Sequence, residues 1–375
     1  MMNSRILQII FCLLLLGACN LVKYKSAPIA LDVKQALTNK KTYDIEQEAK
    51  QIDFVALETR EDCLVGELRK VVKNRDYLFV ADMNSNLFLF TSQGKFLRKI
   101  GATGQGKGEY AILADFDVDR KTNDIYINAG GKLLVYSIGG TFLKSINLGS
   151  SSLQVFCLNQ NGWAMNILPD APSEEGVDSV ALVEAVNLQS GKKECVKSGV
   201  VRRTGFPFFG WIYSKENFTY YKPELGNCIY RLNESNQKSK FLELEFGDLA
   251  FTENLFDFGA NQKWNSHYRV KNFMVFKDKF MINLQKGLMG EELLPLIYDR
   301  QKGDFFFPQN TAEKEGLYFE NISLQPLADE EENLICSMSI PEIIESKNTA
   351  TNQEFRKIAR DVNKNSNPVF VICKF

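Results

Sequence analysis

The sequence contains a single histidine, His267, among 375 residues. One imidazole cannot supply a zinc site built from several histidines, and a Ser-His-Asp triad would have to use this residue. The chain also lacks a G-x-S-x-G segment, which carries the nucleophile of many serine hydrolases. These absences exclude most histidine-dependent hydrolases and favour a packing or surface role for His267.

Neither sign of charge dominates, because 45 Lys and Arg residues stand against 46 Asp and Glu residues. A chain of net charge −1 lacks the surplus of positive charge with which proteins attract the phosphates of nucleic acids. We therefore expect no nucleic acid partner.

The N-terminus carries the features of an export signal. Met1–Arg5 supplies a positive charge, and Ile6–Leu16 is an apolar segment that is too short to span a bilayer comfortably as a helix. The following Leu16-Gly17-Ala18-Cys19 resembles the lipobox of bacterial lipoproteins, in which the chain is cut before the cysteine and the thiol carries a diacylglycerol. We predict a signal peptide at residues 1–18 and lipidation of Cys19. The alternative is an ordinary signal peptide with a chance cysteine.

Residues 19–50 are the predicted lipid anchor and tether, because Asn20–Glu48 is polar with little periodicity. Lipid on Cys19 would attach the protein to a membrane without a transmembrane helix. By resemblance to lipoprotein sorting, Asn20 in place of aspartate predicts the outer membrane. The lack of an acidic cluster in Asn20–Lys23 favours its periplasmic face.

Six cysteines remain beyond Cys19, and none has C-x-x-C spacing. An exported chain could form disulfides. Free cysteine, however, often packs as a small hydrophobic residue, and four of the six lie in apolar, strand-like runs: Cys157, Cys228, Cys336 and Cys373. We favour unpaired core thiols for most of them.

Leu78–Ile100 is followed by a partial copy of itself, Asp124–Ile146. At an offset of 46 residues the aligned pairs include Asp82 and Asn128, Gly94 and Gly140, and Phe96 and Phe142. Each copy has the pattern of three short strands separated by a polar break and a Gly-containing turn. A period in the forties built from short strands is typical of a β-propeller blade.

The same pattern predicts an all-β fold over residues 51–375, a six-bladed β-propeller. Strand and turn positions place the blades at about Gly66–Ile100, Ala111–Leu148, Leu153–Lys197, Phe208–Phe246 and Val270–Phe307, with the sixth beginning near Leu317. Two further strand patterns lie at the ends of the domain, Ile52–Glu58 and Pro368–Phe375. Pairing these N- and C-terminal strands within one blade would close the ring and remove two open edges.

One late segment has the helical period instead. Thr351 and Glu354 fit a capping box, and Phe355–Val362 carries apolar residues at helical spacing. We predict one α-helix that packs its apolar face on the propeller; the alternative is a helix that binds a partner.

Several of these segments resemble the six-bladed β-propeller lipoproteins of Bacteroidetes, which are relatives of the NHL-repeat propellers. The matching residues are Leu16–Cys19, Val55–Thr59, Gly101–Tyr110, Phe116–Asp119, Tyr230–Leu232 and Asn367–Ile372. The resemblance covers roughly residues 52–375. It implies six blades and export, and it brings no settled activity and no catalytic residues.

The glycine-rich segment Gly101–Glu109 could contact a ligand through Gln105, Lys107 and Glu109. It departs from a phosphate-binding P-loop, because Gly108 stands where serine or threonine is required and a strand follows in place of a helix. Its glycines also permit the positive-φ turns that a crossover between two blades needs. We favour this structural role. Ligand contact at the mouth of the propeller channel is the alternative.

The segment Gly205–Trp211 is rich in aromatic residues and leads into the fourth predicted blade. If exposed, Phe208 and Trp211 would form a stacking platform for sugars or for an apolar partner; if buried, they would pack between blades. Arg202 and Arg203, just before them, could bind an anionic ligand or remain solvated. We favour burial for most of the segment and keep all four residues as candidate ligand-binding residues.

The spacing of Asp115, Asp117 and Asp119 resembles the start of a calcium loop. Arg120 occupies the sixth position, where glycine is required, and Tyr126 the twelfth, where glutamate is required. Strand alternation, which places the three carboxylates on one face, explains the spacing without a metal. We expect no metal ion and no cofactor.

Together these observations predict a non-enzymatic envelope lipoprotein whose propeller binds a protein partner or a glycan. The prediction depends on the missing catalytic motifs and on a closed platform with variable loops. The alternative is a carbohydrate-active lyase or hydrolase with its site at the channel mouth. Nothing in the sequence singles out the carboxylate pair that such an enzyme would use.

Overall fold

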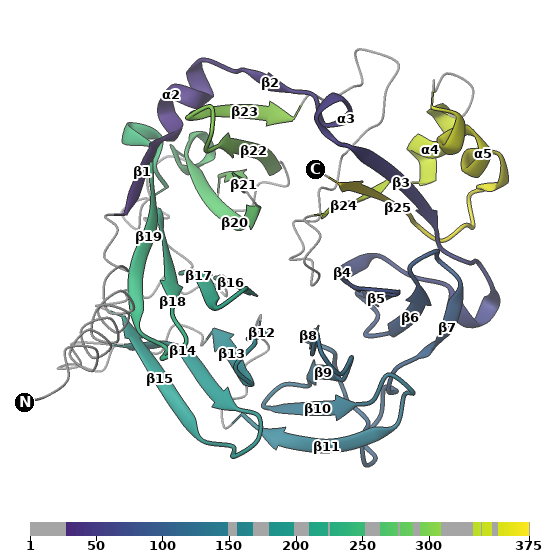
Figure 1. Ribbon diagram of the computed structural model, residues 1–375. Coiled ribbons are helices and arrows are strands. Elements are labelled where there is room, and N and C mark those ends of the chain that lie inside the picture. The colour runs from purple at the N-terminus through teal and green to yellow at the C-terminus, as the bar shows by residue number, and fades with distance from the viewer. Residues whose placement is uncertain are drawn as a thin grey trace, which may run out of the picture.

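The computed structural model describes residues 28–148, 156–167, 180–198, 210–223, 226–251, 263–276, 278–287, 293–308, 333–338, 340–346 and 352–374. Its strands form six sheets that follow one another around a closed ring (Figure 1). Each sheet is one blade, so the predicted all-β, six-bladed propeller is confirmed.

The first three blades are four-stranded antiparallel sheets whose strands follow each other in sequence. Blade 1 contains β4 (Leu68–Asn74), β5 (Tyr77–Asp82), β6 (Leu87–Thr91) and β7 (Phe96–Lys99). Blade 2 contains β8 (Asp115–Val118), β9 (Ile125–Asn128), β10 (Lys132–Tyr136) and β11 (Phe142–Asn147). Blade 3 contains β12 (Phe156–Leu158), β13 (Trp163–Ile167), β14 (Val180–Asn187) and β15 (Lys193–Ser198). Gly94 and Gly140 occupy the same turn in blades 1 and 2, with φ of +85° and +82°, which explains why the repeat keeps a glycine there.

Blades 4 and 5 each gain a fifth strand. Blade 4 contains β16 (Trp211–Lys215), β17 (Phe218–Lys222), β18 (Cys228–Leu232) and β19 (Lys238–Glu245). Blade 5 contains β20 (Tyr268–Phe276), β21 (Lys279–Lys286), β22 (Leu293–Asp299) and β23 (Asp304–Pro308), and the 3₁₀ turns η2 (Gly247–Leu249) and η4 (Lys263–Ser266) precede it. The added strands pair in parallel with the outer strands: β1 (Ile29–Asp32) with β19 and β2 (Thr42–Tyr43) with β23.

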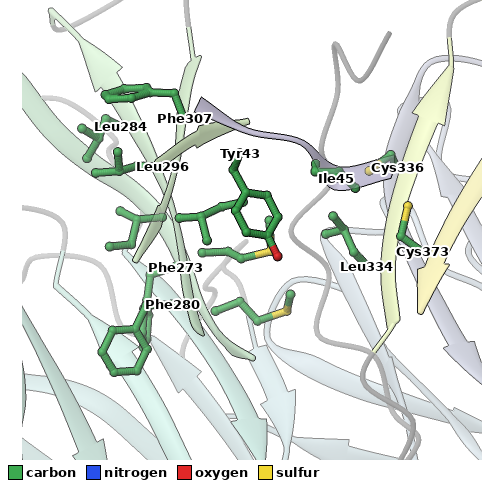
Figure 2. Close-up of a cluster of buried hydrophobic side chains, with 14 of the residues drawn as sticks. Tyr43, Ile45, Phe273, Phe280, Leu284, Leu296, Phe307, Leu334, Cys336 and Cys373 are labelled. Atoms are coloured by element: carbon green, nitrogen blue, oxygen red, sulfur yellow. The ribbon is translucent and has the colours of Figure 1, made fainter. Parts of the chain in front are cut away.

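Residues 28–50, the later part of the predicted anchor and tether at residues 19–50, form a belt around blades 4 and 5, whereas residues 19–27 lie outside the described residues. Helix α2 (Val33–Thr38) lies between its two strands, and α3 (Ile45–Glu48) follows them. Tyr43 and Ile45 of the belt are buried between side chains of blade 5 and of the last blade (Figure 2). The belt has few apolar residues, but the fold buries them, which an average over a polar segment does not reveal.

Blade 6 joins the two ends of the chain. Its described strands are β24 (Asn333–Met338), β25 (Val369–Lys374) and β3 (Gln51–Ala56), in that order outward. Strand β25 pairs antiparallel with β3, with Val369 opposite Ala56 and Lys374 opposite Gln51. This confirms the predicted closure by the terminal strands. The predicted start of the blade near Leu317 lies outside the described residues.

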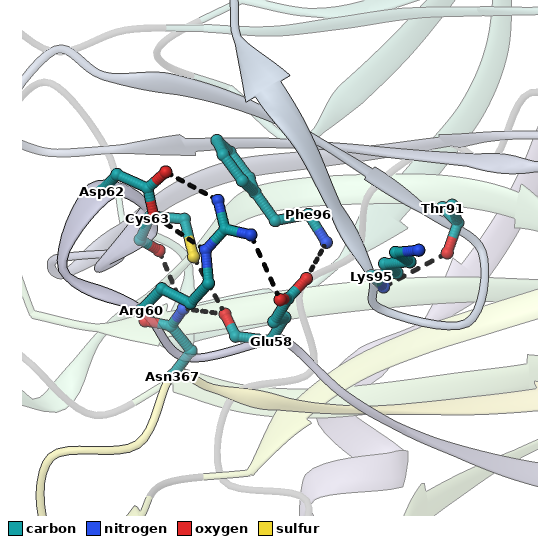
Figure 3. A network of polar contacts seen from close by, with 8 residues as sticks. All are labelled: Glu58, Arg60, Asp62, Cys63, Thr91, Lys95, Phe96 and Asn367. Atoms are coloured by element: carbon teal, nitrogen blue, oxygen red, sulfur yellow. Dashed lines mark hydrogen bonds and ion pairs between the residues drawn. The ribbon is translucent and has the colours of Figure 1, made fainter.

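Polar contacts surround the point where β3 leaves blade 6 (Figure 3). The Glu58 carboxylate accepts a hydrogen bond from Phe96 N at 2.8 Å, which ties the end of β3 to blade 1. Arg60 pairs with Asp62 at 2.6 Å in the short 3₁₀ turn η1 (Glu61–Cys63). Asn367 lies beneath them and bonds to the same stretch of chain.

Two helices, α4 (Ile340–Ser346) and α5 (Gln353–Asp361), lie between β24 and β25, where the sequence predicts one. The N-cap of α5 is Asn352 rather than the expected Thr351, because the Asn352 Oδ1 accepts from the backbone N–H groups of Glu354 and Phe355 at 3.0 and 3.1 Å. The Phe355 ring is buried against Phe54 of β3, with the ring centroids 5.5 Å apart. The apolar face of the helix thus packs on the propeller.

All six cysteines after Cys19 fall within the described residues, and all are free. Four of them are buried, namely Cys63, Cys157, Cys336 and Cys373, whereas Cys195 is exposed. Burial raises the pKa of the Cys157 thiol to about 12, so this thiol stays protonated at neutral pH.

Candidate functional site

We name the face at which the innermost strands begin the top face of the propeller. In blade 1 this face carries the loop that leads into β4 and the turn between β5 and β6, and the two are hydrogen-bonded to each other. Gly66 N donates to Asp82 Oδ2 at 3.2 Å, and Met83 N donates to the Glu67 carbonyl at 2.8 Å. Val65 is hydrogen-bonded to Asn367, so the segment that carries α4 and α5 returns to the ring at the same face.

The glycine-rich loop Gly101–Glu109 crosses from blade 1 to blade 2 at the top face. A side chain at Gly108 would place its Cβ 2.7 Å from the Phe142 ring, and Gly108 has a φ of +80°. The Tyr136 hydroxyl donates to the Gly108 carbonyl, and the Tyr110 backbone closes the loop by bonds to Ala102 and Gly104. These contacts support the structural role that the sequence favours.

The three candidate ligand contacts of this loop differ in their surroundings. Gln105 and Lys107 are exposed, whereas Glu109 is partly buried and accepts a hydrogen bond from Gly106 N at 2.8 Å. The carboxylate of Glu109 thus helps to shape the loop. A ligand-binding role for these three residues stays a prediction.

The candidate residues of blade 4 are only partly described. Trp211 is the first residue of β16, and its indole N–H donates to the Phe273 carbonyl of blade 5 at 2.8 Å. The partly buried indole therefore takes part in the contact between two blades, and a ligand-binding role for Trp211 stays a prediction. Arg202, Arg203 and Phe208 lie outside the described residues.

The aspartates of β8 join three neighbouring blades. Asp115 accepts from Lys70 Nζ of blade 1 at 2.9 Å and from Phe156 N of blade 3 at 2.9 Å. Asp117 Oδ2 accepts from Leu158 N of blade 3 at 2.8 Å. Burial raises the pKa of Asp115 despite the lowering effect of Lys70. The carboxylates thus bind N–H donors of the innermost strands, which explains their alternate spacing.

Three exposed apolar side chains lie on neighbouring loops of the top face. Leu64, Met83 and Ile112 are 51%, 50% and 37% exposed. Their loops are hydrogen-bonded to one another, because the Met83–Ser85 turn bonds to Glu67 on one side and to Leu113 N on the other, the latter at 3.2 Å. We name Leu64, Met83 and Ile112 the apolar patch.

Two innermost strands carry a β-bulge, and each bulge residue is basic. The register of β4 against β5 shifts between Leu68 and Lys70, which leaves Arg69 out of the ladder, and that of β20 against β21 shifts around Lys271. Arg69 donates to the Ala114 carbonyl at 3.0 Å. Although Lys271 reaches solvent, the surrounding protein and the Arg269 guanidinium lower its pKa.

Sequence reasoning missed both residues for a physical reason. A bulge is a mismatch between two strands, so it becomes visible only when the register of both strands is known. The available signal was weak: Arg69 and Lys271 are basic residues next to apolar residues in strand-like segments.

A metal site, histidine chemistry and a membrane span each have structural requirements with which the described residues can be compared. No group of three or more His, Cys, Asp and Glu side chains among them is placed to hold a metal ion. His267 lies beside Ser266 in the segment before β20, with 3.3 Å between Nδ1 and Oγ. Within the same part of the chain, no helix has the length and apolar character needed to cross a membrane.

Solved structures with the same fold come from Bacteroides species. A protein named as exported, from Bacteroides fragilis, has a TM-score of 0.71 at 16% identity, over 92% of this chain and 99% of that chain. A member of the DUF4221 family from Bacteroides vulgatus has a TM-score of 0.54 at 10% identity, over 87% of this chain and 97% of that chain. Identities this low show the fold alone.

The family comparison covers the belt and all six blades. No curated protein matches the chain. Residues 28–374 match the family described as Domain of unknown function (DUF4934), from just before β1 to the end of β25. The chain therefore belongs to the DUF4934 family.

Proposed function

We propose that this chain is a non-enzymatic lipoprotein of the bacterial envelope whose top face binds another envelope protein. In this proposal residues 1–18 are removed as a signal peptide and Cys19 carries the lipid. The protein then lies at the outer membrane, facing the periplasm. The Bacteroides fragilis neighbour is named as exported, which supports the export step of this proposal.

The apolar patch carries the proposal. Leu64, Met83 and Ile112 come from three loops that are hydrogen-bonded to one another, so the patch is held in a fixed arrangement. Apolar side chains that stay exposed on such a rigid surface are typical of protein interfaces. A glycan would gain less from aliphatic side chains than a protein would, and this favours a protein partner.

The position of the belt also supports a top face that is accessible to a partner. Its first strand, β1, lies on blade 4, and blade 4 lies across the ring from blade 1 (Figure 1). Asn20–Pro28 could extend at most about 30 Å from a lipid on Cys19. A chain anchored in this way would hold blade 4 near the membrane and leave the apolar patch of blade 1 accessible.

An enzymatic role has less support among the described residues. The acidic side chains of β8, Asp115 and Asp117, both bind backbone N–H donors of blade 3. These bonds use both carboxylates to hold neighbouring blades together, which accounts for the two residues without a catalytic role. The lyase or hydrolase therefore remains the weaker alternative.

Site-specific photo-crosslinking of the full chain in cells tests the proposal. A photoreactive amino acid replaces Leu64, Met83 or Ile112, one position at a time. Leu143 is the matched control, because it is 50% exposed but lies on the outer strand of blade 2. We expect one envelope protein, identified by mass spectrometry, to crosslink from the patch and not from position 143. The purified pair should then bind in solution.

Equal crosslinking from Leu143 and from the patch would contradict the proposed interface. Mass spectrometry of the mature N-terminus tests the anchor separately. A diacylglycerol on Cys19 is expected, and a free N-terminus elsewhere would contradict the lipoprotein assignment.

A further inference from the structure

The two basic bulge residues occupy equivalent places in their blades. Arg69 lies five residues before Asn74, the last residue of β4, and Lys271 lies five residues before Phe276, the last residue of β20 (74 − 69 = 276 − 271 = 5). The ladders between the first two described strands of blades 2, 3 and 4 show no such shift. Blades 1 and 5 therefore share a feature that these three blades lack.

A bulge changes where a side chain points. The extra residue leaves the ladder, so its side chain is directed independently of the strand's alternation, and bulges are often found beside binding sites. In both blades the residue released in this way is a cation, and both lie toward the top face, where β4 and β20 begin. Arg69 follows the loop that carries Leu64, and Lys271 lies on the same face two blades away, so the top face carries positive charge beside the apolar patch and on the blade beyond blade 6.

The neighbouring charges do not neutralise these cations. Lys70, next to Arg69, is paired with Asp115 at 2.9 Å. Among the residues that the structure describes, no carboxylate forms an ion pair with Arg69 or Lys271. Arg269 faces the neutral Gln285, whose Oε1 accepts from its Nε at 3.0 Å, and it repels the Lys271 ammonium. Like charges that lie close together favour a bound anion.

We infer that Arg69 and Lys271 bind carboxylates of an acidic segment in the partner protein. This inference rests on the proposed function, because it names the chemistry of the partner at the same face. A peptide fits better than an acidic glycan, since Leu64 lies in the loop that leads into β4 and the apolar patch requires apolar side chains beside the carboxylates. The partner segment thus combines glutamate or aspartate with aliphatic residues.

Peptide binding to the full chain, purified in detergent, tests the inference. The probe is a fluorescent ten-residue peptide of alternating Glu and Leu, compared with the same peptide carrying Gln in place of Glu and with polygalacturonate. Arg69→Gln and Lys271→Gln are compared with Lys121→Gln, which removes a lysine from the exposed turn after β8. Melting curves establish that each variant is folded.

We expect each of the two bulge variants to weaken binding of the Glu-Leu peptide about fivefold, as the loss of one partly exposed ion pair would. The Lys121 variant should bind like the unchanged protein. The Gln-Leu peptide should bind more weakly, and added salt should reduce the difference between the two peptides.

Several outcomes would overturn the inference. If Leu64→Ser and Met83→Ser abolish binding while both bulge variants bind normally, the top face binds a partner without these cations and the proposed function survives. If none of the four variants affects binding, or the Glu-Leu peptide does not bind, the inference fails, and the crosslinking result decides the proposed function. Tighter binding of polygalacturonate that depends on Arg69 and Lys271 would make the ligand an acidic glycan.

Discussion

The side chain of Asn367 accepts a hydrogen bond from Val65 N at 2.9 Å, across 302 residues of chain. Its amide nitrogen donates to the carbonyls of Glu58 and Cys63, at 2.7 and 2.8 Å, and its backbone N–H donates to Thr59 Oγ1 at 2.9 Å. One buried side chain thus fastens the start of β25 to the segment that leads into blade 1 (Figure 3). It adds a fixed point to the ladder that closes the ring.

Asn367→Ala should lower the free energy of unfolding by about 3 kcal/mol, because three backbone groups, of which the Cys63 carbonyl is buried and the other two are partly buried, lose their partner at once. Asn365→Ala, an exposed asparagine in the same loop, is the control and should change stability little. Urea unfolding followed by fluorescence measures both. Equal midpoints for the two variants would show that the junction does not depend on Asn367.

Deletion of Pro368–Phe375 should unfold the whole domain. It removes β25, which lies between β24 and β3, so both of these strands lose their partner. Circular dichroism and thermal melting measure the effect, and removal of Phe375 alone is the control. A truncated protein with an unchanged melting temperature would contradict closure by the terminal strands.

The ring could be predicted because its signals are local or repeated. The first blade is expected at Gly66–Ile100, and its strands run from Leu68 to Lys99. The belt could not be predicted. Its strands pair in parallel with the edges of β19 and β23, and such pairing needs an existing edge but no periodic pattern in the added strand.

In the candidate site, too, features that depend on residue type could be predicted, and features that depend on the assembled ring could not. The structural role of Gly101–Glu109 follows from the type of residue, because glycine at a crossover indicates positive φ. The basic bulge residues can be recognised only from the strand register, and the apolar patch only from which loops lie side by side. Both are properties of the assembled ring. Trp211 was noted for its aromatic character, but its bond to the Phe273 carbonyl depends on how blades 4 and 5 pack.

Gly108→Ala tests whether the glycine-rich loop is held by packing. Both Gly108 and Gly191 have positive φ, so alanine costs about 1 kcal/mol at either position. At Gly108 the new Cβ would also collide with Phe142, whereas Gly191 has nothing within 4 Å. We therefore expect Gly108→Ala to be more destabilising than Gly191→Ala by at least about 1 kcal/mol in urea unfolding. Equal losses would mean that the loop adjusts freely.

Asp117 should stabilise the contact between blades 2 and 3 without a metal ion. Asp117→Ala leaves the Leu158 N–H without its acceptor and should cost about 2 kcal/mol, whereas Asp117→Asn keeps an oxygen there and should cost less. Thermal melting with added calcium and with EDTA provides the metal test. We expect the same melting temperature in both, and a rise with calcium that Asp117→Ala abolishes would contradict the assignment.

Lys271 should reduce stability at neutral pH. Burial by the surrounding protein and repulsion by Arg269 lower its folded-state pKa below 10.5, while the unfolded chain keeps the ordinary value. Between those two pKa values the unfolded state binds more protons, so the free energy of unfolding rises with pH in that range. Lys271→Gln removes the repulsion. The variant should be more stable than the unchanged protein by only a few tenths of a kcal/mol at pH 7, because the solvent that reaches this partly covered side chain screens the repulsion.

Urea unfolding between pH 7 and pH 10 measures this difference, which should shrink as the pH approaches 10.5. Lys121→Gln reports any general effect of removing a lysine from the surface. A Lys271→Gln variant that is less stable at pH 7 would contradict the repulsion. Addition of the Glu-Leu peptide should reverse the order, because a bound carboxylate favours the ammonium form and the peptide stabilises the unchanged protein more than the variant, which binds it about fivefold more weakly. That reversal would connect the lowered pKa to binding. It would show that the Lys271 ammonium destabilises the unbound protein and is stabilised by a carboxylate of the bound peptide.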